Sequence, residues 1–175
     1  MKNFTNLSPD EVLAMAIGVE GTNAARYAIW ADRFRPYNED VSELFDELAE
    51  EEKLYQKKLM DIFTERYGNK KVVVDPERIS KVVKDSNLDL EHFFVLDEKM
   101  EKGLLLEAMK AEFETFVFFK QALLSTKDPR LLELYNKLAD FEEQHVNELK
   151  SSIEEDEIKQ ANEGDPLVAE RSSIR

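Results

Sequence analysis

The sequence predicts an all-α protein, an antiparallel four-helix bundle of two helix hairpins with one long crossover between the second and third helices. The 175 residues include only five glycines and five prolines, and residues that favour helices are abundant. Apolar residues recur at helical spacing in four long segments. The length suits one domain, so we expect residues 1–160 to form the bundle and residues 161–175 to form a polar tail.

The first helix is predicted to begin after Ser8, where Pro9 suits the first helical position and Glu11 completes a capping box. It is expected to end near Phe34, because the residue before Pro36 avoids helical backbone angles. Its apolar stripe comprises Leu13, Ala16, Ile17, Ala24, Tyr27, Ala28 and Ala31.

The second helix is predicted over residues 38–67, with Gly68 as its C-terminal cap. The third is predicted over residues 97–124. The fourth is expected to start at the cap-plus-proline pair Asp128-Pro129 and to run to about Ile158. Short links within each pair of helices imply antiparallel neighbours.

The connection between the two pairs spans residues 68–96 and is expected to contain an extended piece followed by one or two short helices. Two helix hairpins joined by a single long crossover form the ferritin-like variant of the four-helix bundle.

Composition excludes several classes of function. Without cysteine, the chain cannot form disulfides, thiolate metal sites or iron–sulfur clusters. The formal net charge of −14 argues against nucleic acid as a partner, and the acidity could serve solubility or attract cations. No apolar run reaches the roughly 18 residues of a membrane-spanning helix. The N-terminus lacks the pattern of a signal peptide, so we expect a cytoplasmic protein with no membrane partner.

Each apolar stripe also contains a glutamate. The i, i+3, i+4 spacing places each of these carboxylates on the buried face of its helix. A single one could be a boundary residue that reaches solvent. Four at similar depth would be costly, because buried carboxylates must be paired, protonated or bound to metal. Two divalent cations would neutralise the four residues, Glu20, Glu52, Glu112 and Glu142.

The two halves of the chain repeat one another. Residues 48–55 read LAEEEKLY and residues 138–145 read LADFEEQH, which share Leu, Ala and Glu in register and end in Tyr55 and His145. Regular leucine spacing alone would explain the shared leucines, but it would not place a glutamate in all four stripes.

These segments resemble the ferritin-like, rubrerythrin-type di-iron carboxylate proteins, whose helices carry Glu, Glu-x-x-His, Glu and Glu-x-x-His in turn. The matching segments are AIGVEGTNAARY, AEEEKLY, AMKAEFETFVFF and FEEQH, within about residues 10–153. The resemblance implies two iron ions as cofactors, with manganese or mixed occupancy as alternatives. It also implies dioxygen or peroxide as reactants. Family members usually add a cysteine-ligated iron module, so this cysteine-free chain would need an external electron donor.

By the same resemblance, Glu52 and Glu142 would bridge the two ions, and Glu20 and Glu112 would each bind mainly one. His145 would complete the ligands of one ion through a ring nitrogen. No catalytic residue is predicted beyond these metal ligands.

Tyr55 stands where the second histidine is expected. It could be a core residue, a phenolate ligand of iron, or the mark of a lost second site. Tyr27, two turns after Glu20, could donate a hydrogen bond to a ligating carboxylate or simply pack in the core. His92, in the crossover, is expected to be a surface or packing residue.

The leading functional hypothesis is iron oxidation or another redox reaction linked to peroxide or dioxygen. The alternatives are a non-catalytic metal-binding protein with an incomplete second site and a purely structural helical module. Phe113 and Phe118 lie off the main stripe of the third helix, and an exposed face there would indicate a homodimer.

Overall fold

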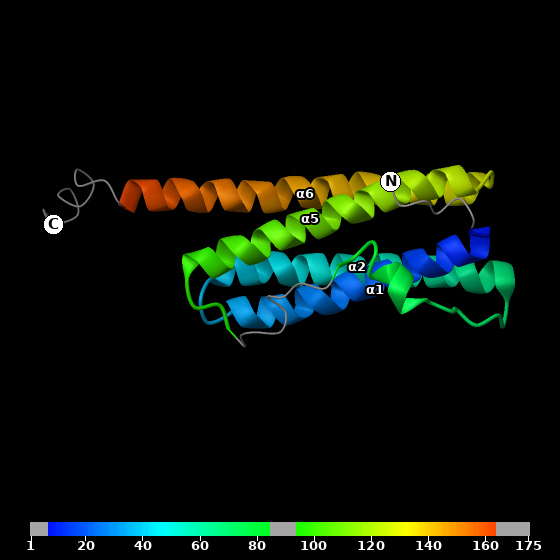
Figure 1. Ribbon diagram of the computed structural model, residues 1–175, viewed down its shortest axis with the longest axis horizontal. Coiled ribbons are helices and arrows are strands. Elements are labelled where there is room, and N and C mark those ends of the chain that lie inside the picture. Colours follow the sequence, from blue (N-terminus) through cyan, green and yellow to red (C-terminus); the bar gives the residue numbers. More distant parts are fainter. Residues whose placement is uncertain (1–6, 85–93, 164–175) are drawn as a thin grey trace, which may run out of the picture.

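The computed structural model of the chain describes residues 7–84 and 94–163. Most of these residues lie in long helices, and no β-strand occurs among them (Figure 1). The elements are α1 (Pro9–Phe34), α2 (Glu39–Tyr67), α3 (Pro76–Ile79), α5 (Glu98–Ala122), the 3-10 turn η1 (Leu123–Ser125) and α6 (Pro129–Glu163). The predicted all-α bundle of two hairpins is confirmed.

The predicted helix starts are confirmed by their caps. The Glu11 carboxylate accepts a hydrogen bond of 2.9 Å from the Ser8 backbone N–H, which closes the capping box of α1. The Asn38 side chain caps α2, and Asp128 accepts a hydrogen bond of 2.9 Å from the N–H of Arg130 at the start of α6.

The helices form two antiparallel hairpins, α1 with α2 and α5 with α6 (Figure 1). Since α2 and α5 run in the same direction, their connection must return along the length of the bundle. It leaves α2 at Gly68, whose φ of 59° suits glycine, continues through residues 70–75 without regular secondary structure and enters the single turn of α3. A second short helix in this connection would fall, like His92, outside the described residues.

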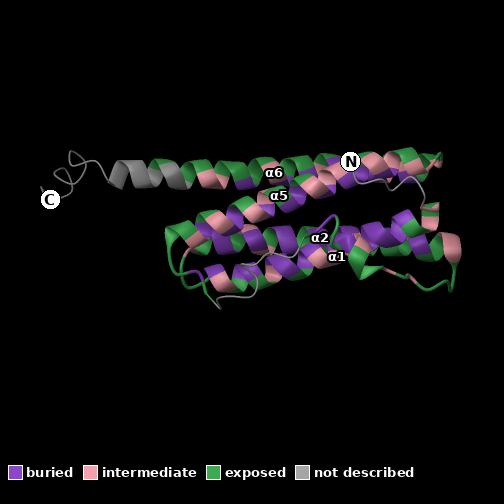
Figure 2. Cartoon of the chain, viewed as in Figure 1, coloured by how far each residue is buried: buried purple, intermediate pink, exposed green. Residues whose placement is uncertain are grey.

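The core consists of two separate clusters of buried apolar side chains. Figure 2 shows buried and exposed residues alternating along each of the long helices. One lies around Leu13, Leu59 and Tyr135, and the other around Trp30 and Phe45. Each long helix carries one of the four predicted glutamates, which lies between the segment that supplies one cluster and the segment that supplies the other. The bundle therefore encloses a polar layer between two apolar ones.

Three details differ from the sequence expectations. The third helix ends in a 3-10 turn, and α6 continues to Glu163 rather than stopping near Ile158. Phe118 is buried in the first cluster, whereas Phe113 is 55% exposed, so only Phe113 lies on an outer face. Among the described residues, none of the helices is long and apolar enough to cross a membrane.

Candidate metal centre

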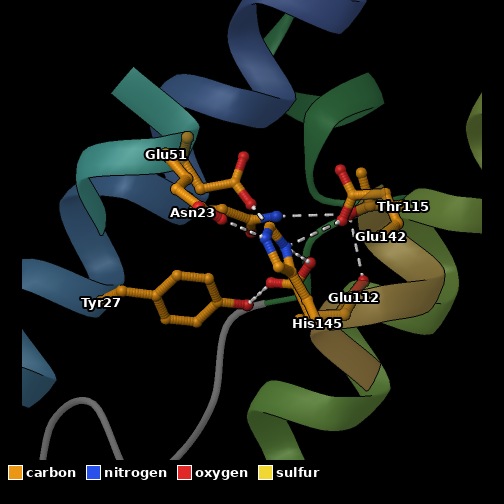
Figure 3. Close-up of polar contacts among 9 residues, drawn as sticks. Asn23, Tyr27, Glu51, Glu112, Thr115, Glu142 and His145 are labelled. Atoms are coloured by element: carbon orange, nitrogen blue, oxygen red, sulfur yellow. Dashed lines mark hydrogen bonds and ion pairs between the residues drawn. The ribbon is translucent and has the colours of Figure 1, made fainter. Parts of the chain in front are cut away.

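Four of the predicted ligands form a compact cluster in the polar layer. Each offers one ligand atom, and these atoms all lie within 4.8 Å of one another. The residues come from three helices, α2, α5 and α6, and each is at most 1% exposed. Figure 3 labels three of them together with their hydrogen-bonding neighbours. They are Glu52, Glu112, Glu142 and His145.

The fifth predicted ligand, Glu20 of α1, is fully buried beside Glu52. In the part of the chain that the structure describes, no hydrogen-bond donor reaches either oxygen of Glu20 or of Glu52. The two carboxyls face each other and can share a hydrogen bond only when one of them carries a proton. Oxygens buried in this way need a proton or a cation, so they fit a divalent metal ion.

His145 presents its two ring nitrogens to different partners. Its Nδ1 lies 3.3 Å from Glu112, 3.5 Å from Glu52 and 3.9 Å from Glu142. Its Nε2 lies 2.8 Å from an oxygen of Glu51, on the opposite side of the ring (Figure 3). The nitrogen that faces the carboxylates is the one placed to bind a metal.

Burial and mutual repulsion control the charges of this cluster. Loss of hydration raises the pKa of Glu20 to about 7, and it raises the pKa values of Glu52 and Glu142 well above the ordinary value. Burial also opposes ionisation of Glu112, but hydrogen bonds from Glu142 and His145 hold its pKa below the ordinary value. Because of these shifts, the metal-free site limits its negative charge by taking up protons.

A raised pKa favours the charged form of a histidine, whereas it favours the neutral form of a glutamate. Burial lowers the pKa of His145, but the neighbouring carboxylates Glu112 and Glu51 outweigh that effect and raise it to about 9. Divalent cations would displace these protons, because metal ligands bind in their deprotonated forms. The donor set of carboxylates and one imidazole suits iron or manganese.

Tyr27 donates a hydrogen bond from its hydroxyl to Oε1 of Glu112 (Figure 3). Burial, together with the charge of Glu112, raises the pKa of Tyr27 well above its ordinary value, so the phenol keeps its proton. Tyr27 lies on the first hairpin and Glu112 on the second, so the hydrogen bond fixes the orientation of this predicted ligand from the other hairpin.

Tyr55 lies at the edge of the polar layer, with its ring centroid 4.7 Å from that of Phe141 and Lys58 Nζ 4.8 Å from its ring centroid. Within the described part of the chain, the Tyr55 hydroxyl makes no hydrogen bond. Burial raises its pKa above the ordinary value, and the nearby glutamates raise it further. Both observations favour a neutral, packed phenol in the metal-free protein.

Sequence reasoning missed three polar neighbours of this layer. Asn23, fully buried, donates to Thr115 at 3.2 Å and thereby joins α1 to α5. These two residues follow Glu20 and Glu112 by three positions, a spacing that could have indicated them. Glu51 was missed because it stands in a run of three glutamates that look equivalent in sequence.

Comparisons with known proteins agree with the helical-bundle fold. The family model for rubrerythrin matches residues 11–153. A solved structure of a hypothetical protein from Pyrococcus furiosus is similar, with a TM-score of 0.74 and 25% sequence identity, over 87% of this chain and 92% of that chain. No curated protein matches the chain.

Proposed function

Because the chain belongs to the rubrerythrin family, we propose that it is a di-iron carboxylate protein that oxidises Fe(II) or performs other redox chemistry with peroxide or dioxygen. The observation that carries the proposal is the buried layer of carboxylates in which, among the described residues, both oxygens of Glu20 and Glu52 and one oxygen of Glu142 lack a hydrogen-bond partner. The proposed ligands are Glu20, Glu52, Glu112, Glu142 and His145.

In this proposal the side chains would bind the metal ions, hold the ligands in orientation and neutralise the charge of the ions. Glu52 faces both Glu20 and His145, which supports its role as a ligand shared between two ions. Tyr27 holds Glu112 in place. Bound iron would supply one-electron chemistry toward dioxygen or peroxide, and manganese accepts the same ligands. Electrons would come from an external donor, since the chain has no cysteine-ligated iron of its own.

Anaerobic loading with Fe(II) tests the proposal. We expect two iron ions per chain, followed by Fe(II)-dependent consumption of peroxide or dioxygen. The Glu52→Ala variant should bind less iron, because it removes the carboxylate between Glu20 and His145. A matched control is Glu143→Ala, which removes an exposed carboxylate next to Glu142. Parent protein without bound iron, or full iron content in Glu52→Ala, would contradict the proposal.

A second candidate is a metal-binding protein without catalysis. Glu20 is not among the four residues of the compact cluster, and Tyr55 stands where the second imidazole is expected. The half of the site beside Glu20 therefore offers fewer metal ligands. One tightly bound ion without Fe(II)-dependent consumption of oxidant would favour this candidate. Protein that binds no transition metal would instead indicate a structural module.

The proposal extends to a cytoplasmic homodimer formed through the outer face of α5. Its support is the pair Leu106 and Phe113, which are 42% and 55% exposed and lie two turns apart on the same face. Light scattering of the purified chain tests it, and a Phe113→Glu variant should shift a dimer toward monomer.

A further inference from the structure

One hydrogen bond links the buried cluster to the protein surface. Glu51 Oε2 lies 2.8 Å from His145 Nε2, and their side chains are 52% and 2% exposed. Successive residues of a helix point about 100° apart. Glu52 of α2 therefore enters the buried layer, while its neighbour Glu51 approaches the imidazole from the solvent side.

The two nitrogens of this imidazole cannot play the same role. A histidine that binds a metal through Nδ1 must carry its remaining proton on Nε2. A carboxylate that accepts the Nε2–H stabilises that tautomer and fixes the plane of the ring. Among the described residues, Glu51 is the hydrogen-bond partner of Nε2, whereas Nδ1 faces Glu52, Glu112 and Glu142.

We propose that Glu51 is the positioning residue of His145. Glu51, on α2, accepts the Nε2–H of His145, on α6, and thereby directs the Nδ1 lone pair of the imidazole into the carboxylate cluster. The inference rests on the proposed metal centre and adds a residue to it that binds no metal itself. The contact also spans the two hairpins, so the ring orientation depends on how α2 and α6 are placed relative to each other.

Zinc affinity tests this role without any redox step, because Zn²⁺ accepts carboxylate and imidazole ligands. We expect Glu51→Ala to bind Zn²⁺ roughly 10–100-fold more weakly than the parent. Glu51→Gln should recover part of the loss, since its amide oxygen can accept the Nε2–H. Glu143→Ala is the matched control: it removes an exposed carboxylate beside Glu142, as Glu51→Ala removes one beside Glu52. Circular dichroism checks that each variant remains helical.

Nitrogen NMR of histidine supplies a readout that charge alone would not change. The chain has two histidines, so a His92→Gln background leaves the signals of His145 alone. In zinc-loaded protein we expect one tautomer, with the proton on Nε2 and the metal on Nδ1. Zinc-loaded Glu51→Ala should show a second population in which the ring is turned, with the metal on Nε2 and the proton on Nδ1.

Several results would overturn the inference. Zinc affinity or tautomer unchanged in Glu51→Ala would show that the hydrogen bond has no positioning role. An equal loss in Glu143→Ala, or no recovery in Glu51→Gln, would show that only negative charge matters. Parent protein that binds neither zinc nor iron would contradict the metal centre itself, and the inference with it.

Discussion

At the scale of single residues, the two tyrosines of the polar layer have opposite surroundings. The Tyr27 hydroxyl donates to Glu112, whereas the Tyr55 hydroxyl makes no hydrogen bond among the described residues. Sequence left both roles open, because periodicity places a side chain on a face without showing where its polar tip ends. For the same reason it could not distinguish Glu51 from the glutamates on either side.

Replacing Tyr27 by Phe should destabilise the metal-free protein by about 1–3 kcal/mol, because a buried carboxylate loses a donor while the ring packing remains. Urea denaturation in the presence of a chelator measures the change. Tyr67→Phe is the control, since that hydroxyl makes no hydrogen bond in the described part of the chain, and we expect it to change stability by less than about 0.5 kcal/mol. Equal losses in both variants would contradict the assigned hydrogen bond.

Tyr55 gives a spectroscopic prediction. The packing against Phe141 and the raised pKa favour a neutral phenol, so Tyr55→Phe should leave the visible absorption of iron-loaded protein unchanged. Loss of a visible charge-transfer band would instead identify a phenolate ligand. Tyr55→His should strengthen binding of a second ion, because it restores the imidazole of the Glu-x-x-His pattern, and metal titration would measure this.

At the scale of elements, the sequence predicts best what is encoded locally. The predicted starts of three helices are confirmed, because Glu11 accepts a hydrogen bond from the Ser8 N–H, and Asn38 and Asp128 accept hydrogen bonds from backbone N–H groups of their own helices. The burial of Phe118 could not be predicted, since it depends on the neighbouring helix rather than on α5 alone. Likewise, the four glutamates were identified by periodicity, but their separation into a compact group and Glu20 required the packed structure.

Gly18 of α1 allows the crossover to approach. A Cβ atom at this position would lie 2.5 Å from Val74 Cγ1 and 2.7 Å from Ile79 Cδ1. Alanine favours helix over glycine by about 1 kcal/mol, but overpacking typically costs about 1–3 kcal/mol. We therefore expect Gly18→Ala to be neutral or destabilising by up to about 2 kcal/mol, measured by urea denaturation. Adding Val74→Ala should remove part of the clash, and a Gly18→Ala variant more stable than the parent would contradict this close approach.

At the scale of the whole molecule, the polar layer lowers the stability of the metal-free fold. The two apolar clusters hold the helices together above and below it, while the buried carboxyls between them must be protonated, paired or bound to cations. Metal binding should add stability, by about 2.7 kcal/mol when the free ion is at 100 times its dissociation constant. The fold and its site are thus linked through the charge state of this layer.

That linkage predicts an unusual pH dependence for the metal-free protein. The pKa of Glu20 is raised from 4.5 to about 7 in the folded state, so its contribution is fully present below pH 4.5 and is lost as pH rises through 7. His145, raised from 6.5 to about 9, acts in the same direction at higher pH. The lowered pKa of Glu112 has the opposite sign, but its contribution is lost only as pH falls below about 4.5.

Stability should therefore fall between pH 5 and 9 when metal is absent. The shift of Glu20 alone corresponds to about 3 kcal/mol, which would lower the melting temperature by roughly 6–12 °C. Thermal melts with a chelator at constant ionic strength measure it, and Glu20→Gln should reduce the fall because that side chain cannot ionise. With saturating Fe(II) under anaerobic conditions the slope should reverse, since higher pH deprotonates the ligands and strengthens binding. A metal-free protein that gains stability from pH 5 to 8 would contradict the buried, protonated carboxyls.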